Sequence, residues 1–273
     1  MTYTDAVRFL TDAGIENASA DAAILFEHFA GIPRHELPFR RNEDITSAAF
    51  LEALKRRISR EPLQYILGEW EFCGLAFSLN RDCLCPRPDT ELIVELALKN
   101  LPPWAHFCDI GTGSGAIAVS ILHYRPDTTA DAYDISEGAL CAARKNAERN
   151  MVADRFSAIK ADALSDDFLT DCEKYDAVIS NPPYIPASVI PTLAPEVLLE
   201  PHRALDGGED GLDFYRAIIC KSQLALKPGG FVLFEVGADQ AQAVASIGYA
   251  HGFSPELYPD LSGIMRAVLL KTT

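Results

Sequence analysis

The stretch SNPPYIP, residues 180 to 186, combines a stiff backbone with two side chains that could hold a planar polar group. Pro182 and Pro183 fix the backbone φ angle and remove two N–H donors, so the neighbouring carbonyls are left free to point outward. The amide of Asn181 can donate and accept hydrogen bonds, and the ring of Tyr184 can stack on a flat group. A purely structural proline turn, closed by an asparagine hydrogen bond, would use the same residues. The motifs elsewhere in the chain distinguish these two interpretations.

A glycine-rich loop occurs earlier, in CDIGTGSGAIAV, between a predicted strand and a predicted helix. Gly111, Gly113 and Gly115 would let the backbone turn sharply and let a ligand approach the main chain at the helix N-terminus. Asp134 ends the next predicted strand, where a carboxylate can accept both hydroxyls of a ribose. A glycine turn with only a structural role would need no such acid. The combination predicts a site for an adenosine-containing cofactor.

The spacing of this loop differs from the G-x-G-x-x-G fingerprint of dinucleotide-binding folds. The sequence DIGTGSG instead resembles the first motif of the class I S-adenosylmethionine-dependent methyltransferases. Asp162, in KADAL, matches the place where that class contacts the adenine edge, and KPGG followed by FVLFEV is also typical of the class. The resemblance implies that the cofactor is S-adenosyl-L-methionine.

A methyl-donor pocket would give the proline turn a chemical role. An amide or exocyclic amine nitrogen is a poor nucleophile because its lone pair is delocalised. The Asn181 side-chain oxygen and the Pro182 carbonyl could accept its two N–H hydrogens, aim the lone pair at the methyl group and stabilise the developing charge. Tyr184 could stack on the planar group. The same motif serves adenine amines, guanine amines and glutamine amides, so it predicts the chemistry and leaves the substrate open.

The predicted elements fall into three parts. The first 60 residues show helical patterns, for example in SADAAILFEHFAG, and no strand signal. The stretch QYILGEWEFCGLAFSLN predicts two short strands joined at Gly74. From residue 106 onward strands alternate with helices, which predicts an α/β fold with a mostly parallel sheet that binds its ligand at the carboxyl ends of the strands.

Four stretches narrow the choice of substrate: REPLQYILGEWEFCGLAF, PRPDTELIVE, SNPPYIP and EPHRALDGGEDGLDFYRAI. With the glycine loop, they closely resemble the N(5)-glutamine methyltransferase family that modifies bacterial peptide chain release factors. The resemblance implies a doubly wound, mostly parallel seven-stranded sheet of the class I methyltransferase type. It also implies a small helical substrate-recruiting domain over residues 1–66, a β-hairpin linker over 67–86 and a methyltransferase domain over 87–273. The substrate would be the glutamine of the Gly-Gly-Gln loop in class 1 release factors.

The resemblance also implies roles for individual residues. Asn181, Pro182 and Tyr184 would be catalytic and, with Pro183, would hold the substrate amide. The donor site would be formed by Arg87, Pro88, Thr90, Gly111, Thr112, Gly113, Ser114, Gly115, Asp134, Asp162, Ala163 and Asn181.

Composition limits the alternatives. The formal net charge of -15 disfavours a broad phosphate-binding surface, and therefore disfavours the main rival, a nucleic-acid amino-group methyltransferase. A non-catalytic cofactor-binding adaptor would not need Asn181 and Tyr184 together.

The basic cluster at Lys55, Arg56, Arg57 and Arg60 is expected to be a solvated helix face. Seven scattered cysteines without a C-x-x-C pair predict free thiols and no metal site. With no apolar run of membrane-spanning length and no signal-peptide pattern, we expect a cytoplasmic protein without membrane or stable nucleic-acid partners.

Overall fold

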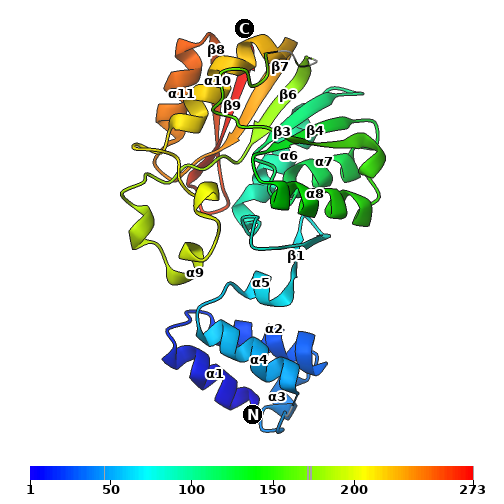
Figure 1. Ribbon diagram of the computed structural model, residues 1–273, viewed down its shortest axis with the longest axis vertical. Coiled ribbons are helices and arrows are strands. Elements are labelled where there is room, and N and C mark those ends of the chain that lie inside the picture. The colour runs from blue at the N-terminus through cyan, green and yellow to red at the C-terminus, as the bar shows by residue number, and fades with distance from the viewer. Residues whose placement is uncertain (46, 171, 173, 273) are drawn as a thin grey trace. The chain divides into compact units, whose positions relative to one another are not determined.

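The computed structural model describes residues 1–45, 47–170, 172 and 174–272 (Figure 1). The contacts of the chain divide it into two compact units. The first unit comprises Met1–Gly68 and Ala194–Leu199, and the second comprises Glu69–Leu193 and Glu200–Thr273. The hairpin, which we predicted as a linker over residues 67–86, has its contacts within the second unit.

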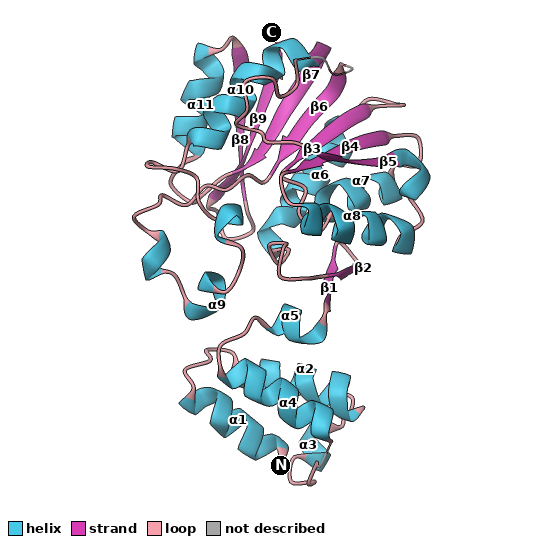
Figure 2. Cartoon of the chain, in the orientation of Figure 1, coloured by secondary structure: helices cyan, strands magenta, loops and turns pink. Residues whose placement is uncertain are grey.

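The first unit is helical, as its amphipathic patterns predict (Figure 2). Its helices are α1 (Tyr3–Asp12), α2 (Ala18–Ala30), α3 (Leu37–Arg40), α4 (Ala48–Ile58), α5 (Leu63–Leu67) and, from much later in the chain, α9 (Pro195–Leu198). Thr2 caps α1 through a reciprocal bond pattern with Asp5, which satisfies backbone donors that the first turn leaves unpaired. Phe26 and Phe50 form the centre of the core, with ring centroids 4.5 Å apart in an edge-to-face arrangement.

One arginine of the basic cluster on α4 is buried, contrary to the expectation of a solvated face. The side chain of Arg57 is only 9% exposed and lies 2.7 Å from a carboxylate oxygen of Asp21 and 3.1 Å from one of Glu196. Arg60 also pairs with Glu196, at 2.7 Å. These ion pairs join α2, α4 and α9, because a buried guanidinium needs compensating charge and hydrogen bonds.

The second unit begins with the predicted hairpin. Strands β1 (Glu69–Phe72) and β2 (Leu75–Ser78) pair antiparallel and turn at Cys73 and Gly74, which both have positive φ angles. The buried amide of Asn146 holds the hairpin in place, since it accepts from the Ser78 N–H at 2.7 Å and donates to the Ser78 carbonyl at 3.0 Å. The same amide donates to the Ser114 carbonyl at 2.8 Å, so it also fixes the glycine loop.

The main sheet has the seven predicted strands. They are β3 (His106–Ile110), β4 (Thr129–Asp134), β5 (Phe156–Lys160), β6 (Tyr175–Ser180), β7 (Leu226–Glu235), β8 (Phe253–Pro259) and β9 (Met265–Thr272). Their order is β5-β4-β3-β6-β7-β9-β8, and β9 is antiparallel to both of its neighbours. The predicted class I methyltransferase architecture, doubly wound and mostly parallel with a final antiparallel strand, is confirmed.

Helices cover both faces of this sheet (Figures 1 and 2). One face carries α6 (Glu91–Asn100), α7 (Ala116–Tyr124) and α8 (Glu137–Arg149), and the other carries α10 (Asp213–Ala225) and α11 (Ala241–Ala250). Single 3₁₀ turns occur at η1 (Pro88–Thr90), η2 (Ala153–Arg155), η3 (Ile190–Thr192) and η4 (His202–Ala204).

On β7, Val232 and Phe234 pack in the core beneath α10 and α11. Because successive strand residues point to opposite faces, Glu235 faces the α6 side. No helix in the described ranges is long and apolar enough to cross a membrane.

Candidate active site

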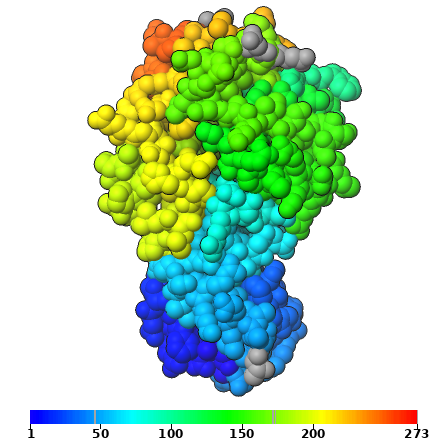
Figure 3. All heavy atoms as spheres, in the orientation of Figure 1, coloured from blue at the N-terminus to red at the C-terminus, as the bar shows by residue number. Residues whose placement is uncertain are grey.

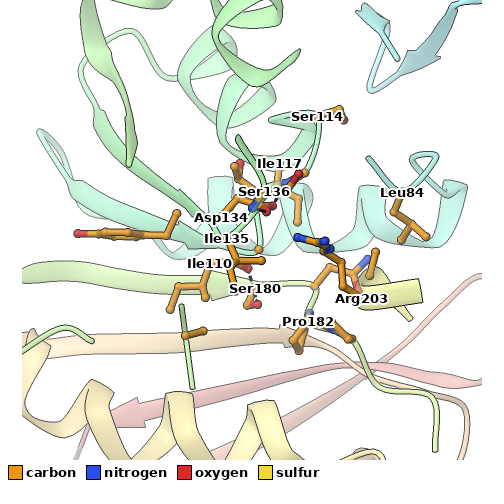
Figure 4. Close-up of a pocket in the computed structure, with 18 of the residues that line it drawn as sticks. Leu84, Ile110, Ser114, Ile117, Asp134, Ile135, Ser136, Ser180, Pro182 and Arg203 are labelled. Carbon is orange, nitrogen blue, oxygen red and sulfur yellow. Dashed lines mark hydrogen bonds between the residues drawn. The ribbon is translucent and has the colours of Figure 1, made fainter. Parts of the chain in front are cut away.

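A cavity of about 270 Å³ opens at the carboxyl ends of β3, β4 and β6 (Figure 4). In a doubly wound sheet this edge is where ligands bind. The cavity is lined by these predicted site residues: Arg87, Thr90, Gly111, Thr112, Gly113, Ser114, Asp134, Asp162, Ala163, Asn181, Pro182 and Pro183. Three other predicted site residues, Pro88, Gly115 and Tyr184, do not line it.

The glycines of the loop after β3 have two different roles. Gly111 and Gly113 have φ angles of +71° and +56°, which other residues rarely adopt. A Cβ atom at Gly111 would meet nothing within 4 Å, and one at Gly113 would come no closer than 4.0 Å to the protein, so both border open space where a ligand can approach the main chain. A Cβ at Gly115 would lie only 3.2 Å from Ala143 of α8. Gly115 therefore serves the packing of α7 against α8, which explains its absence from the cavity wall.

Asp134 has a geometry that suits two hydroxyl donors. Its Oδ2 accepts from the Gly113 N–H at 2.9 Å and its Oδ1 from the Ser136 N–H at 2.8 Å. These bonds fix the carboxylate and leave each oxygen with capacity for another hydrogen bond. Burial raises the pKa of Asp134, an effect that the two backbone bonds and the charge of Arg203 oppose. Figure 4 shows the Arg203 side chain extending toward Asp134.

A second carboxylate holds the loop from within the sheet. Asp109, at 1% exposure, accepts from Thr112 Oγ1 at 2.7 Å and from the Ala118 N–H at 3.3 Å. Burial raises the pKa of Asp109 to about 7. The Ser180 hydroxyl donates to the Ile110 carbonyl at 2.6 Å and joins the ends of β6 and β3. The glycine loop and the Asn181 motif are therefore held beside each other by buried polar contacts.

An apolar wall adjoins the acids. Ile135 and Leu164 line the cavity with exposures of 46% and 45%, directly after Asp134 and two residues after Asp162. Exposed aliphatic side chains of this kind offer a flat base a surface to pack on, with the hydrogen-bonding acids at its edge. Ile135 directly follows Asp134 in the sequence, so its place on the cavity wall could have been predicted from the position of Asp134.

The motif after β6 has two oxygen atoms that are available as hydrogen-bond acceptors. Asn181 Nδ2 donates to Thr90 Oγ1 at 3.2 Å. Within the described ranges, neither the Oδ1 atom of Asn181 nor the Pro182 carbonyl receives a hydrogen bond. The Tyr184 hydroxyl lies 3.4 Å from Glu235 Oε1, and burial raises the pKa of this phenol to about 12, so Tyr184 is neutral near pH 7.

The segment EPHRALDGGEDG packs against the back of the motif. The Ile185 N–H donates to the Leu205 carbonyl, and the Gly207 N–H donates to the Ile185 carbonyl, both at 2.9 Å. A Cβ at Gly207 would lie 2.8 Å from Tyr184 Cα and 2.9 Å from the Pro183 carbonyl oxygen. Only glycine allows this approach. In the space-filling view, yellow atoms from around residues 200–210 meet green atoms from around 130–150, the segments that contribute Arg203 and Asp134 to the cavity (Figure 3).

Two supporting residues were missed by sequence reasoning. Glu200 is buried, accepts from the Cys85 N–H at 2.9 Å and forms an ion pair with Arg87 of the cavity wall. Glu235, the last residue of β7, is also buried. A lone Glu gives no sign of burial in the sequence, although Glu200 lies in the same short stretch as His202 and Arg203. Over the described part of the chain, no group of three or more His, Cys, Asp or Glu side chains could hold a metal ion.

The cavity fits a methyl donor that carries a ribose and a flat base. Beside it, Asn181 Oδ1 and the Pro182 carbonyl are available to accept the two N–H groups of a planar nitrogen. These features, on a sheet of this strand order, are those of a class I S-adenosylmethionine-dependent methyltransferase.

Comparisons with known proteins identify the family. A family model described as "PrmC N-terminal domain" matches residues 2–68, and one described as "Methyltransferase small domain" matches residues 89–209. The chain is 39% identical to the release factor glutamine methyltransferase of Moorella thermoacetica, over 97% of this chain and 95% of that protein. It is 42% identical to the protein of the same name from Cereibacter sphaeroides, over 96% and 94%. The chain belongs to the release factor glutamine methyltransferase family.

A solved structure supports the fold independently. The chain resembles a methyltransferase from Pyrococcus furiosus, with a TM-score of 0.54 and 20% identity, over 72% of this chain and 88% of that chain.

Proposed function

We propose that this chain transfers a methyl group from S-adenosyl-L-methionine to the side-chain amide nitrogen of the glutamine in the Gly-Gly-Gln loop of class 1 peptide chain release factors. Family membership supports the reaction and the protein substrate. The observation that carries the chemistry is the pair of free acceptors, Asn181 Oδ1 and the Pro182 carbonyl, at the mouth of a cavity suited to the donor.

The residues of the motif would orient the amide. S-adenosyl-L-methionine supplies an electrophilic methyl group on a sulfonium when it is bound. Asn181 Oδ1 and the Pro182 carbonyl would each accept one N–H of the glutamine amide, which turns its nitrogen lone pair toward the methyl group. Transfer would form the N–C bond and break the C–S bond of the bound methyl donor, and the electron pair of the broken bond would stay on sulfur. The two acceptors stabilise the positive charge that develops on nitrogen.

The proton balance needs no strong base. The nitrogen becomes acidic as the methyl group arrives, and one of its two protons then leaves to water. Tyr184 lies beside the cavity without lining it, and we assign its ring to stacking on the amide plane of the incoming substrate. Pro183, which does line the cavity, keeps this turn stiff.

The remaining assignments follow from the same site. We assign methyl-donor binding to the residues predicted for it that line the cavity, and to Gly115 only the packing of the loop. These donor-binding residues are Arg87, Thr90, Gly111, Thr112, Gly113, Ser114, Asp134, Asp162, Ala163 and Asn181. We infer a cytoplasmic enzyme whose partner is a release factor, without membrane association or stable nucleic-acid binding. A net charge of -15 supports the last point, because phosphate backbones are bound mainly by Lys and Arg.

One assay separates this function from its rivals. The protein is incubated with methyl-labelled donor and, separately, with a class 1 release factor, DNA and RNA. We expect label only in the release factor, and the Asn181→Ala variant should lose turnover by about a hundredfold or more while it still binds the donor. Label in nucleic acid without label in the release factor would contradict the proposal. Donor binding without any transfer would favour an adaptor.

A further inference from the structure

A chain of hydrogen bonds connects the end of β7 to the motif that would hold the substrate. Glu235, the last residue of β7, is 1% exposed, and its Oε2 atom accepts a bond of 2.6 Å from Thr90 Oγ1. Thr90 Oγ1 is in turn 3.2 Å from Asn181 Nδ2. The other carboxylate oxygen of Glu235, Oε1, is 3.4 Å from the Tyr184 hydroxyl. A single buried carboxylate is thus linked to both polar side chains of the motif.

The direction of these bonds determines which way the Asn181 amide faces. A threonine hydroxyl has one hydrogen to donate and can accept two bonds. The bond of 2.6 Å to Glu235 has the length of a hydroxyl donating to a carboxylate, so it uses the only hydrogen of Thr90. Toward Asn181, Thr90 Oγ1 can then only accept. Asn181 must therefore present Nδ2 to Thr90, which leaves Oδ1 for the substrate.

We propose that Glu235, acting through Thr90, is the positioning residue that selects the catalytic orientation of the Asn181 amide. The inference rests on the proposed function, in which Asn181 Oδ1 accepts an N–H of the substrate glutamine. While the Glu235 carboxylate accepts the Thr90 hydroxyl hydrogen, a flipped Asn181 amide would place its Oδ1 against Thr90 Oγ1, which has no hydrogen left to donate. Without the Glu235 carboxylate, the Thr90 hydroxyl could donate to Asn181 Oδ1. The flipped, inactive orientation of the Asn181 amide would then become equally favourable.

The groups around Glu235 make the orientation of the Asn181 amide depend on pH. Burial raises the pKa of Glu235 to about 7, while the bond from Thr90, the charge of Arg266 on β9 and the weak bond from Tyr184 lower it and the charge of Asp89 in η1 raises it. From α10, the Tyr215 hydroxyl donates to the main-chain carbonyl of Glu235 at 2.9 Å. The active form is the carboxylate, so its protonation as the pH falls below about 7 would release the Thr90 hydroxyl.

The test compares Glu235→Gln and Thr90→Val, singly and together, in the full chain with a release factor as substrate. We expect each single variant to lower kcat by about tenfold to a hundredfold, as for other lost positioning bonds. The double variant should be no slower than Thr90→Val, because both changes break one relay. Thr90→Ser, which keeps the hydroxyl and loses only the methyl group, should lose less kcat than Thr90→Val. The wild-type kcat should fall below about pH 7, and Glu235→Gln should lack this dependence.

Two further measurements keep the outcomes distinct. Glu256→Gln makes the same charge change on β8, at a carboxylate that pairs with Lys271, and should leave kcat unchanged. The Asn181 side-chain NH₂ signals in nitrogen-15 NMR should titrate near pH 7 in the wild type and not in Glu235→Gln, whether or not a substrate is present. Losses in kcat that multiply in the double variant, or NMR signals that do not respond to Glu235, would overturn the relay. Absence of methyl transfer by the wild type would contradict the proposed function instead.

Discussion

Replacing Gly207 with alanine should displace the substrate motif and disturb the rest of the donor site much less. A Cβ atom at this position would lie 2.8 Å from Tyr184 Cα, 2.9 Å from Gly211 Cα and 2.9 Å from the Pro183 carbonyl oxygen. All three contacts are with backbone atoms, so no side chain can rotate away, and either the motif or the segment behind it must shift by several tenths of an ångström. Overpacking of this kind costs about 1–3 kcal/mol of folding free energy.

The effect on catalysis should exceed the effect on donor binding. A displacement approaching 1 Å at a reacting group lowers the rate by about a hundredfold, so we expect Gly207→Ala to lower kcat by about tenfold to a hundredfold. The donor Kd should change by less than about threefold, because Gly207 does not line the cavity. Steady-state kinetics with a release factor and calorimetric titration with the donor measure the two quantities.

A matched variant controls for the loss of stability alone. Gly252 has a φ of +81°, and a Cβ there would meet nothing within 4 Å, so Gly252→Ala adds backbone strain of about 1–2 kcal/mol far from the motif. It should keep wild-type kcat below its unfolding temperature. Equal kcat values for Gly207→Ala and Gly252→Ala would refute the view that the glycine contact positions Pro183 and Tyr184.

Two further predictions concern buried charges. Arg57→Ala should lower the free energy of unfolding by about 3–5 kcal/mol, because it leaves Asp21 and Glu196 without their buried partner. The control Arg34→Ala removes an exposed pair with Glu27 and should lower the free energy of unfolding by less than about 1 kcal/mol. Denaturant unfolding with hydrogen exchange in α2 and α4 compares the two variants, and equal losses would contradict the prediction. Burial raises the pKa of Asp109 from 3.8 to about 7, so its contribution to stability is complete below pH 3.8 and is lost as the pH rises toward 7. Over this pH range, the unfolding free energy of Asp109→Asn should decline less than that of the wild type. An equal decline in both proteins would show that Asp109 does not titrate in the folded protein in this way.

Much of the architecture could be predicted because local patterns carry it. The strand and helix alternation after residue 106 predicted the seven strands, and the Cys-Gly pair in EWEFCGLAF predicted the hairpin turn at Cys73 and Gly74. Ser136 caps α8, and its side chain accepts from the Ala139 N–H, a cap typical of serine. In each case the signal lies within a few residues of the element that it specifies.

The parts that could not be predicted depend on contacts between distant residues. Arg57 looked like part of a solvated basic face, because nothing near it in the sequence shows that Asp21 and Glu196 surround it. The family's glycine motif included Gly115 among donor-site residues, but its role in packing on Ala143 emerges only when α7 and α8 are placed together. Glu235 ends an apolar strand and gives no sequence sign that it meets Thr90, 145 positions away.

The position of the transferred methyl group decides whether this enzyme modifies the side-chain amide of the Gly-Gly-Gln glutamine. A class 1 release factor is treated with the wild-type chain and labelled S-adenosyl-L-methionine, and the modified peptide is located by fragmentation mass spectrometry and then hydrolysed in acid. We predict a single methyl group on the glutamine of the Gly-Gly-Gln sequence, released on hydrolysis as labelled methylamine, and modification by Asn181→Ala that is slower by about a hundredfold or more. Labelled methanol, which would come from a carboxyl ester, or label on any other residue would contradict the account.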